Sequence, residues 1–150
     1  MKNLFLILIV LLAAQTGFGQ ENKKIRLYCE FGDISNDTID IDSVNKNTCV
    51  SLKYDNISNT PSKIEQANSF IIEDFENFNF NDYEIDKVII SSLICIGGIK
   101  NLELENNCID DYASIFFQKP IAKNRLYFEV SIKKYDRTLK KKLIFSIWTK

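Results

Sequence analysis

The sequence Val88-Ile-Ile-Ser-Ser-Leu-Ile-Cys-Ile96 is followed by Gly97-Gly98 and then by Ile99-Lys-Asn-Leu-Glu-Leu-Glu105. Two apolar runs with paired glycines between them are the local signal for a β-hairpin, because glycine adopts the positive φ angles that tight hairpin turns require. This stretch therefore predicts two antiparallel strands, and we expect the flanking elements to pack on them.

A cleaved export signal is predicted at the N-terminus. Lys2 supplies a positive charge, residues 4–14 form an apolar run, and Gly17-Phe18-Gly19 provides the small residues of a cleavage site. The apolar run is shorter than the ~20 residues that a membrane-spanning helix needs. We therefore expect residues 1–19 to be a signal peptide, and residues 20–150 to form a single domain that is periplasmic or secreted.

The charge balance gives no reason to expect nucleic acid as a partner. Removal of Lys2 leaves 18 of the 19 Lys and Arg residues against 20 Asp and Glu residues. Nucleic-acid-binding domains carry a clear excess of positive charge instead.

Four cysteines in an exported chain favour disulfide bonds over a metal site. No Cys-x-x-Cys pair occurs, which argues against a thioredoxin-like redox site. Three pairings of Cys29, Cys49, Cys95 and Cys108 are possible. We favour Cys29 with Cys49 and Cys95 with Cys108, because each bond would join elements that are neighbours along the chain.

Residues 60–78 have the pattern of an amphipathic helix. Thr60 is placed to cap this helix, and Pro61 suits its first position. The apolar residues recur at spacings of three and four and would form one stripe: Ile64, Ala67, Ile71, Phe75 and Phe78.

A second, shorter helix is predicted between Cys108 and Pro120. Asp110 and Asp111 would lie in its first turn, where negative charge compensates the helix dipole. Its apolar stripe would comprise Ile109, Tyr112, Ala113 and Phe116.

Alternation of apolar and polar residues marks the remaining strands. We expect strands at 25–31 and 49–54, a short strand within 38–42, and a C-terminal hairpin of 126–133 with 142–148. The predicted fold class is therefore α+β, with two helices packed on a mainly antiparallel sheet in two layers.

The chain contains no histidine, which removes the commonest general base and all histidine-dependent nucleophile and zinc sites. Two carboxylate pairs remain as candidates for catalysis. We interpret Asp40 with Asp42 as solvated loop charge, and Asp110 with Asp111 as helix-dipole compensation. We expect no enzymatic activity, no metal ion and no cofactor.

One local concentration of positive charge lies near the C-terminus. It can dock an acidic partner or anionic lipid headgroups, but we favour protection of an exposed strand from edge-to-edge aggregation. Trp148 is interpreted as rim packing, with a binding anchor as the alternative. The basic residues are Lys133, Lys134, Arg137, Lys140, Lys141 and Lys142.

The order helix, strand, glycine-containing turn, strand, short helix, strand over residues 60–148 resembles the C-terminal domain of TonB-type periplasmic proteins. The family's proline-containing segments around the first helix have no counterpart here, and residues 21–55 lie outside the resemblance. The resemblance rests on 64–80 as the leading helix, on Gly98-Ile99-Lys100-Asn101-Leu102 in the hairpin, on Asp110-Asp111-Tyr112-Ala113, and on the terminal strand 139–147.

The resemblance implies a module that accepts an extended peptide from an outer-membrane protein as an added strand, through main-chain hydrogen bonds. We expect a non-catalytic binding protein with a protein or peptide partner and no stable membrane insertion. The alternative is a secreted inhibitor or an immunity-type interaction protein. The implied binding edge is the C-terminal strand, with Lys142, Leu143, Ile144, Phe145, Ser146, Ile147 and Trp148.

Overall fold

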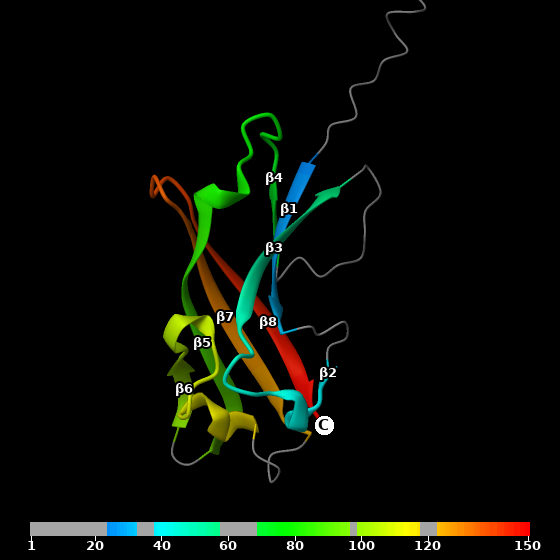
Figure 1. Cartoon of the computed structure of the whole chain (residues 1–150), viewed down its shortest axis with the longest axis vertical. Coiled ribbons are helices and arrows are strands. Elements are labelled where there is room, and N and C mark those ends of the chain that lie inside the picture. Colours follow the sequence, from blue (N-terminus) through cyan, green and yellow to red (C-terminus); the bar gives the residue numbers. More distant parts are fainter. Residues whose placement is uncertain (1–23, 33–37, 58–68, 97–98, 118–122) are drawn as a thin grey trace, which may run out of the picture.

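The computed structural model describes residues 24–32, 38–57, 69–96, 99–117 and 123–150 (Figure 1). The backbone of these residues forms two β-sheets joined by loops and short 3-10 helices. The predicted hairpin is confirmed, since β5 (Tyr83–Ile96) pairs antiparallel with β6 (Ile99–Glu103). The predicted turn, Gly97-Gly98, lies outside the described residues.

The smaller sheet has three antiparallel strands in the order β3-β1-β4. Strand β1 (Lys24–Phe31) lies between β3 (Val50–Ile57) and β4 (Ser69–Ile72). The strands predicted at 25–31 and 49–54 are thus confirmed within β1 and β3. Alternate residues of β1 are buried, as the period-two pattern requires: Ile25, Leu27, Cys29 and Phe31.

The larger sheet has five strands in the order β2-β8-β7-β5-β6. The predicted C-terminal hairpin is confirmed as β7 (Arg125–Lys134) and β8 (Lys140–Thr149), which pair antiparallel. The short strand expected within 38–42 is limited to β2 (Thr38–Ile39), which pairs parallel with the end of β8.

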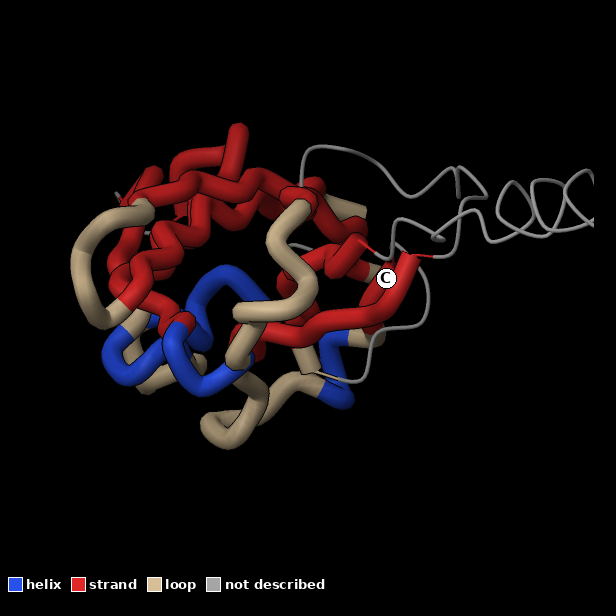
Figure 2. Tube along the Cα trace, turned by 90° about the horizontal axis from the view of Figure 1, so that it is seen from above, coloured by secondary structure: helices blue, strands red, loops and turns tan. Residues whose placement is uncertain are grey.

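The described 3-10 helices are η1 (Ile41–Ser43), η2 (Phe80–Asp82), η3 (Glu105–Asn107) and η4 (Ala113–Phe117). Seen from above, the strands are arranged in an arc around the interior, and the helical segments lie along the other side (Figure 2). Residues of η4 enter the core that the two sheets share.

A row of aromatic rings links the two sheets through this core. Phe31 of β1 stacks on Phe117 of η4, with ring centroids 5.7 Å apart, and lies 4.7 Å from Phe128 of β7. Phe128 stacks in turn on Phe145 of β8 at 4.9 Å. Full burial of one such ring stabilises a fold by roughly 1.5–3 kcal/mol. The row therefore fixes the position of β8 against the smaller sheet.

The predicted α+β class is wrong. The described residues are mostly strand, and their longest helical segment is the five-residue η4. The fold class is instead mainly β, with two sheets that share one core.

The helix predicted at 60–78 is contradicted in its described part. Residues 69–72 form β4, which pairs with β1, and Ile71 and Phe75 are 52% and 38% exposed. Phe70 and Ile72 are partly buried while Ile71 is exposed, so the strand period of two holds here. β-branched and aromatic residues favour this extended state, and β1 supplies its hydrogen-bond partners. Ile64 and Ala67 lie outside the described residues.

The second predicted helix is reduced to η4. Asp110 does act as a cap, because its side chain accepts a hydrogen bond from the Ala113 amide at 2.6 Å. However, Cys108 is extended and bridges to Cys49, and Asn106 and Asn107 before it have positive φ angles. The backbone around the expected start is therefore fixed in a non-helical conformation.

Candidate functional site

Strand β8 lies near one edge of the larger sheet, and the described strands leave most of its outer side unpaired. Its inner neighbour β7 pairs with it along its whole length from Lys140 to Trp148. Its outer neighbour β2 pairs only with Trp148 and Thr149. Among the described residues, no strand pairs with the outer side of β8 before Trp148. Sheet edges of this kind can accept another extended chain.

The backbone hydrogen bonds at both ends of β8 show which backbone groups face the open side. Near the hairpin turn, the Leu139 carbonyl accepts from the Lys134 amide, and at the other end the Thr149 amide donates to Asn124. Odd-numbered residues of β8 therefore bond to β7. Lys150 bonds outward to Ile39 and Ile41 of the β2 region. The backbone N–H and C=O groups of successive residues point to opposite sides of a strand, and the register is unbroken. The backbone groups of even-numbered residues therefore point away from β7, toward the unpaired side of β8. These are Lys140, Lys142, Ile144 and Ser146.

The same even-numbered residues place their side chains on the outer face of the sheet. Ile144 and Trp148 are 48% and 45% exposed. Arg125 of β7 lies between two rings, with its guanidinium carbon 5.4 Å from the Tyr127 centroid and 5.5 Å from the Trp148 centroid. Its Nε and Nη2 atoms donate to the Ser146 Oγ at 3.0 and 2.8 Å. We call Arg125, Tyr127, Ile144, Ser146 and Trp148 the β8 face cluster.

The basic residues noted in the sequence are dispersed by the fold. Lys133 is ion-paired with Glu84 at 3.0 Å and Asp86 at 2.7 Å, and Lys142 with Glu129 at 2.7 Å. Among the described residues, Arg137, Lys140 and Lys141 have no ion-pair partner. They leave positive charge at the hairpin end of β8.

A buried polar network holds the other end of β8 in place. Asn124, Ser92 and Thr149 are 4%, 2% and 1% exposed. The Asn124 Nδ2 donates to the Ser92 Oγ at 2.7 Å, and its backbone amide donates to the Thr149 Oγ1 at 3.0 Å. Buried polar groups need such partners, and here the bonds tie β8 to both β7 and β5. These bonds therefore anchor the C-terminal end of β8 to β5 and to the residue before β7.

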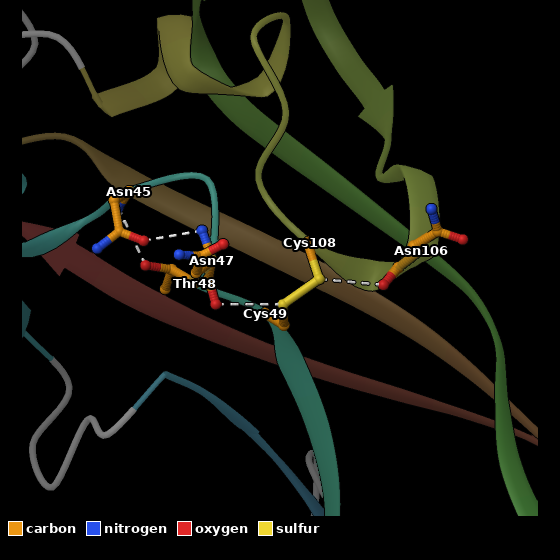
Figure 3. Close-up of a disulfide and its surroundings, with 6 residues drawn as sticks. All are labelled: Asn45, Asn47, Thr48, Cys49, Asn106 and Cys108. Carbon is orange, nitrogen blue, oxygen red and sulfur yellow. Dashed lines mark hydrogen bonds between the residues drawn. A yellow bond between two sulfur atoms is a disulfide. The ribbon is translucent and has the colours of Figure 1, made fainter.

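The structure joins Cys49 to Cys108 by a disulfide between residues 59 positions apart (Figure 3). The favoured pairings, Cys29 with Cys49 and Cys95 with Cys108, are therefore wrong. The bond links the start of β3 to the loop between η3 and η4. Around it, the Ile109 amide donates to the Thr48 carbonyl at 3.0 Å. Sequence neighbourhood failed as a guide because the sheet brings these distant segments together.

Cys29 is a free, buried thiol on the inner face of β1. Burial raises the pKa of its thiol to about 12, so it is protonated and unreactive at neutral pH. The side chain of Cys95 lies outside the described part of the chain.

The carboxylate pairs have local roles. Asp40 caps η1 by accepting from the Asp42 amide at 3.0 Å, and Asp111 is ion-paired with Lys46 at 2.6 Å. A polar cleft of about 500 Å³ lies between β5 and η3, lined by charged and amide side chains that include Asp86, Glu103 and Glu105. Lys87 is ion-paired with Glu103 there. In the described residues, no group of three potential ligands is placed to hold a metal ion.

Sequence reasoning placed the edge on β8 but missed Arg125 and Tyr127. The missing information was the register of the β7–β8 hairpin, which pairs Arg125 with Trp148 and Tyr127 with Ser146. In an antiparallel hairpin, the residue numbers of two opposed partners add up to a constant that the centre of the turn fixes. A turn centred on Asp136 and Arg137 would therefore have predicted that Arg125 lies opposite Trp148.

Comparisons of the chain with protein-family models, curated proteins and solved structures find no match. The helices within the described residues are all too short, or too polar, to cross a membrane. The disulfide is compatible with a periplasmic or extracellular location, where such bonds persist. Fold and site together define a disulfide-bonded, mainly β domain with an accessible edge strand.

Proposed function

We propose that the protein is an exported, non-catalytic binding protein that accepts an extended segment of a partner protein as an added strand on β8. The observation that carries this proposal is the outward direction of the backbone groups of Lys142, Ile144 and Ser146. Each of these residues offers an amide donor and a carbonyl acceptor to an incoming strand.

The neighbouring elements set the length of the site. β2 occupies the outer side of β8 at Trp148 and Thr149, and the hairpin turn begins before Lys140. The open part therefore spans Lys140 to Ile147, which is the length of a segment of about eight residues, because paired strands share a rise of ~3.3 Å per residue. The TonB-type resemblance adds the proposal that the segment belongs to an outer-membrane receptor, although β4 replaces the leading helix of that resemblance at residues 69–72.

A second candidate function is inhibition or neutralisation of a folded partner, such as an exported toxin. The β8 face cluster favours it, because Trp, Tyr and Arg are the residue types that most often dominate the binding energy of protein interfaces. A folded partner would bury the face without needing the edge, so short linear peptides would not bind.

A peptide selection separates these functions. Random nine-residue peptides, displayed on mRNA, are selected against the immobilised protein, and binding of the enriched peptides is mapped by amide chemical shifts. We expect the largest shifts at 140–148. The Ile144→Asp variant should abolish binding, and the Ile71→Asp variant, at a similarly exposed position on β4, should not. Equal binding by Ile144→Asp, or shifts confined to other strands, would count against the proposal.

A further inference from the structure

The guanidinium of Arg125 is a prearranged cation directly beside the open edge. Although it belongs to β7, its side chain crosses to β8 and donates to the Ser146 Oγ through Nε and Nη2. The flanking Tyr127 and Trp148 rings hold it by cation–π contacts at 5.4 and 5.5 Å. A side chain that is already held in place loses little conformational entropy when a ligand binds.

Arg125 also retains capacity for an anion. A guanidinium has five N–H donors, and the bonds to the Ser146 Oγ use only the Nε and Nη2 atoms. Among the described residues, no carboxylate pairs with Arg125, whereas Lys133 and Lys142 on the same face each have an acidic partner. Arg125 therefore presents uncompensated positive charge to whatever lies beside Ser146.

The geometry of strand addition decides which residue of a partner meets this charge. Directly opposed residues on paired strands have Cβ atoms about 4.5–5.5 Å apart, so the residue opposite Ser146 projects beside the guanidinium. The residue two positions away lies opposite Ile144, which is apolar and 48% exposed. Side chains two positions apart share a face of the strand.

We propose that the segment added to β8 carries an aspartate or glutamate opposite Ser146, paired with Arg125, and an apolar residue opposite Ile144. This inference rests on the proposed function and specifies the chemistry of the partner: an apolar and an acidic residue two positions apart. An arginine–carboxylate pair gains from charge-assisted, often bidentate, hydrogen bonds. Asn at the same position keeps the shape of Asp and loses the charge.

The test is a double-mutant cycle between peptide and protein. Two versions of an enriched nine-residue peptide are synthesised, one with Asp opposite Ser146 and one with Asn at the same position. Both have an amidated C-terminus, so that the terminal carboxylate cannot replace the Asp side chain. Both are titrated by calorimetry against wild type, Arg125→Gln, Arg125→Lys, and Lys53→Gln as an equal charge change on the other sheet.

We expect Asp→Asn to weaken binding to wild type and to Lys53→Gln by about tenfold, the change that ~1.4 kcal/mol produces. For Arg125→Gln the two peptides should bind equally, and Arg125→Lys should keep part of the difference because lysine keeps the charge and loses the planar fork. Enriched peptides without an acidic residue, or equal binding of the Asp and Asn peptides to wild type, would overturn the inference and leave strand addition intact. Failure of every peptide to bind β8 would overturn both.

Discussion

Loss of the Cys49–Cys108 bond is the perturbation whose size follows most directly from the structure. The bond closes a loop between residues 59 positions apart. The loop-entropy model gives about 4 kcal/mol for a loop of this length, because the crosslink restricts the unfolded chain. We therefore expect the Cys49→Ser/Cys108→Ser protein to be about 4 kcal/mol less stable than the oxidised wild type.

The assay is urea unfolding followed by far-ultraviolet circular dichroism at pH 7, with the free energy extrapolated to zero denaturant. The single variants provide the control. Since removal of either sulfur breaks the same bond, Cys49→Ser and Cys108→Ser should each lose nearly as much stability as the double variant. A Cys108→Ser protein with wild-type stability, or a double variant that loses less than ~1 kcal/mol, would refute the pairing and the estimate.

Three further outcomes are expected. Replacement of Asn124 by Ala removes its buried bond to Ser92 and should cost ~1–3 kcal/mol in urea unfolding, whereas unchanged stability would contradict the network. Hydrogen bonding from Lys133 lowers the pKa of Asp86. The stabilisation by this pair should therefore be present above the ordinary Asp pKa and disappear as the pH falls through the lowered value. A carbon-13 titration of the Asp86 carboxyl checks this, and Lys133→Met should return its pKa toward the ordinary value. In a Cys95→Ser background, Cys29 should resist Ellman's reagent at pH 8 until urea unfolds the protein, because burial raises its pKa to about 12.

The hairpins could be predicted from sequence because their information is local. Paired glycines and alternating apolar residues marked β5–β6 and β7–β8, and the structure pairs both. The helix expected at 60–78 failed for a different reason. Its apolar spacing suits a helix, but β3 occupies only one side of β1. Pairing of β4 on the other side of β1 satisfies the backbone hydrogen-bonding groups of β4. Tertiary context decided between two states that the residue pattern alone left close in energy.

The cysteine pairing and the β8 face cluster depend on contacts between distant residues. Neighbourhood along the chain favoured Cys29 with Cys49, yet the fold buries Cys29 in β1 and brings Cys108 beside Cys49. Likewise, Arg125 and Trp148 meet only through the register of β7 with β8. Such registers follow from the whole sheet, so the C-terminal strand was predictable and the position of Arg125 beside Ser146 was not.

The most direct test of strand addition is residue-specific amide hydrogen exchange along β8, measured by NMR with and without a saturating enriched peptide. Without peptide, the amides of Leu143, Phe145 and Ile147 should be protected by β7, and those of Ile144 and Ser146 should exchange fast. We predict that bound peptide protects Ile144 and Ser146 as well, because their amides then donate to the added strand. If these two amides still exchange fast when the peptide is bound, the account is contradicted.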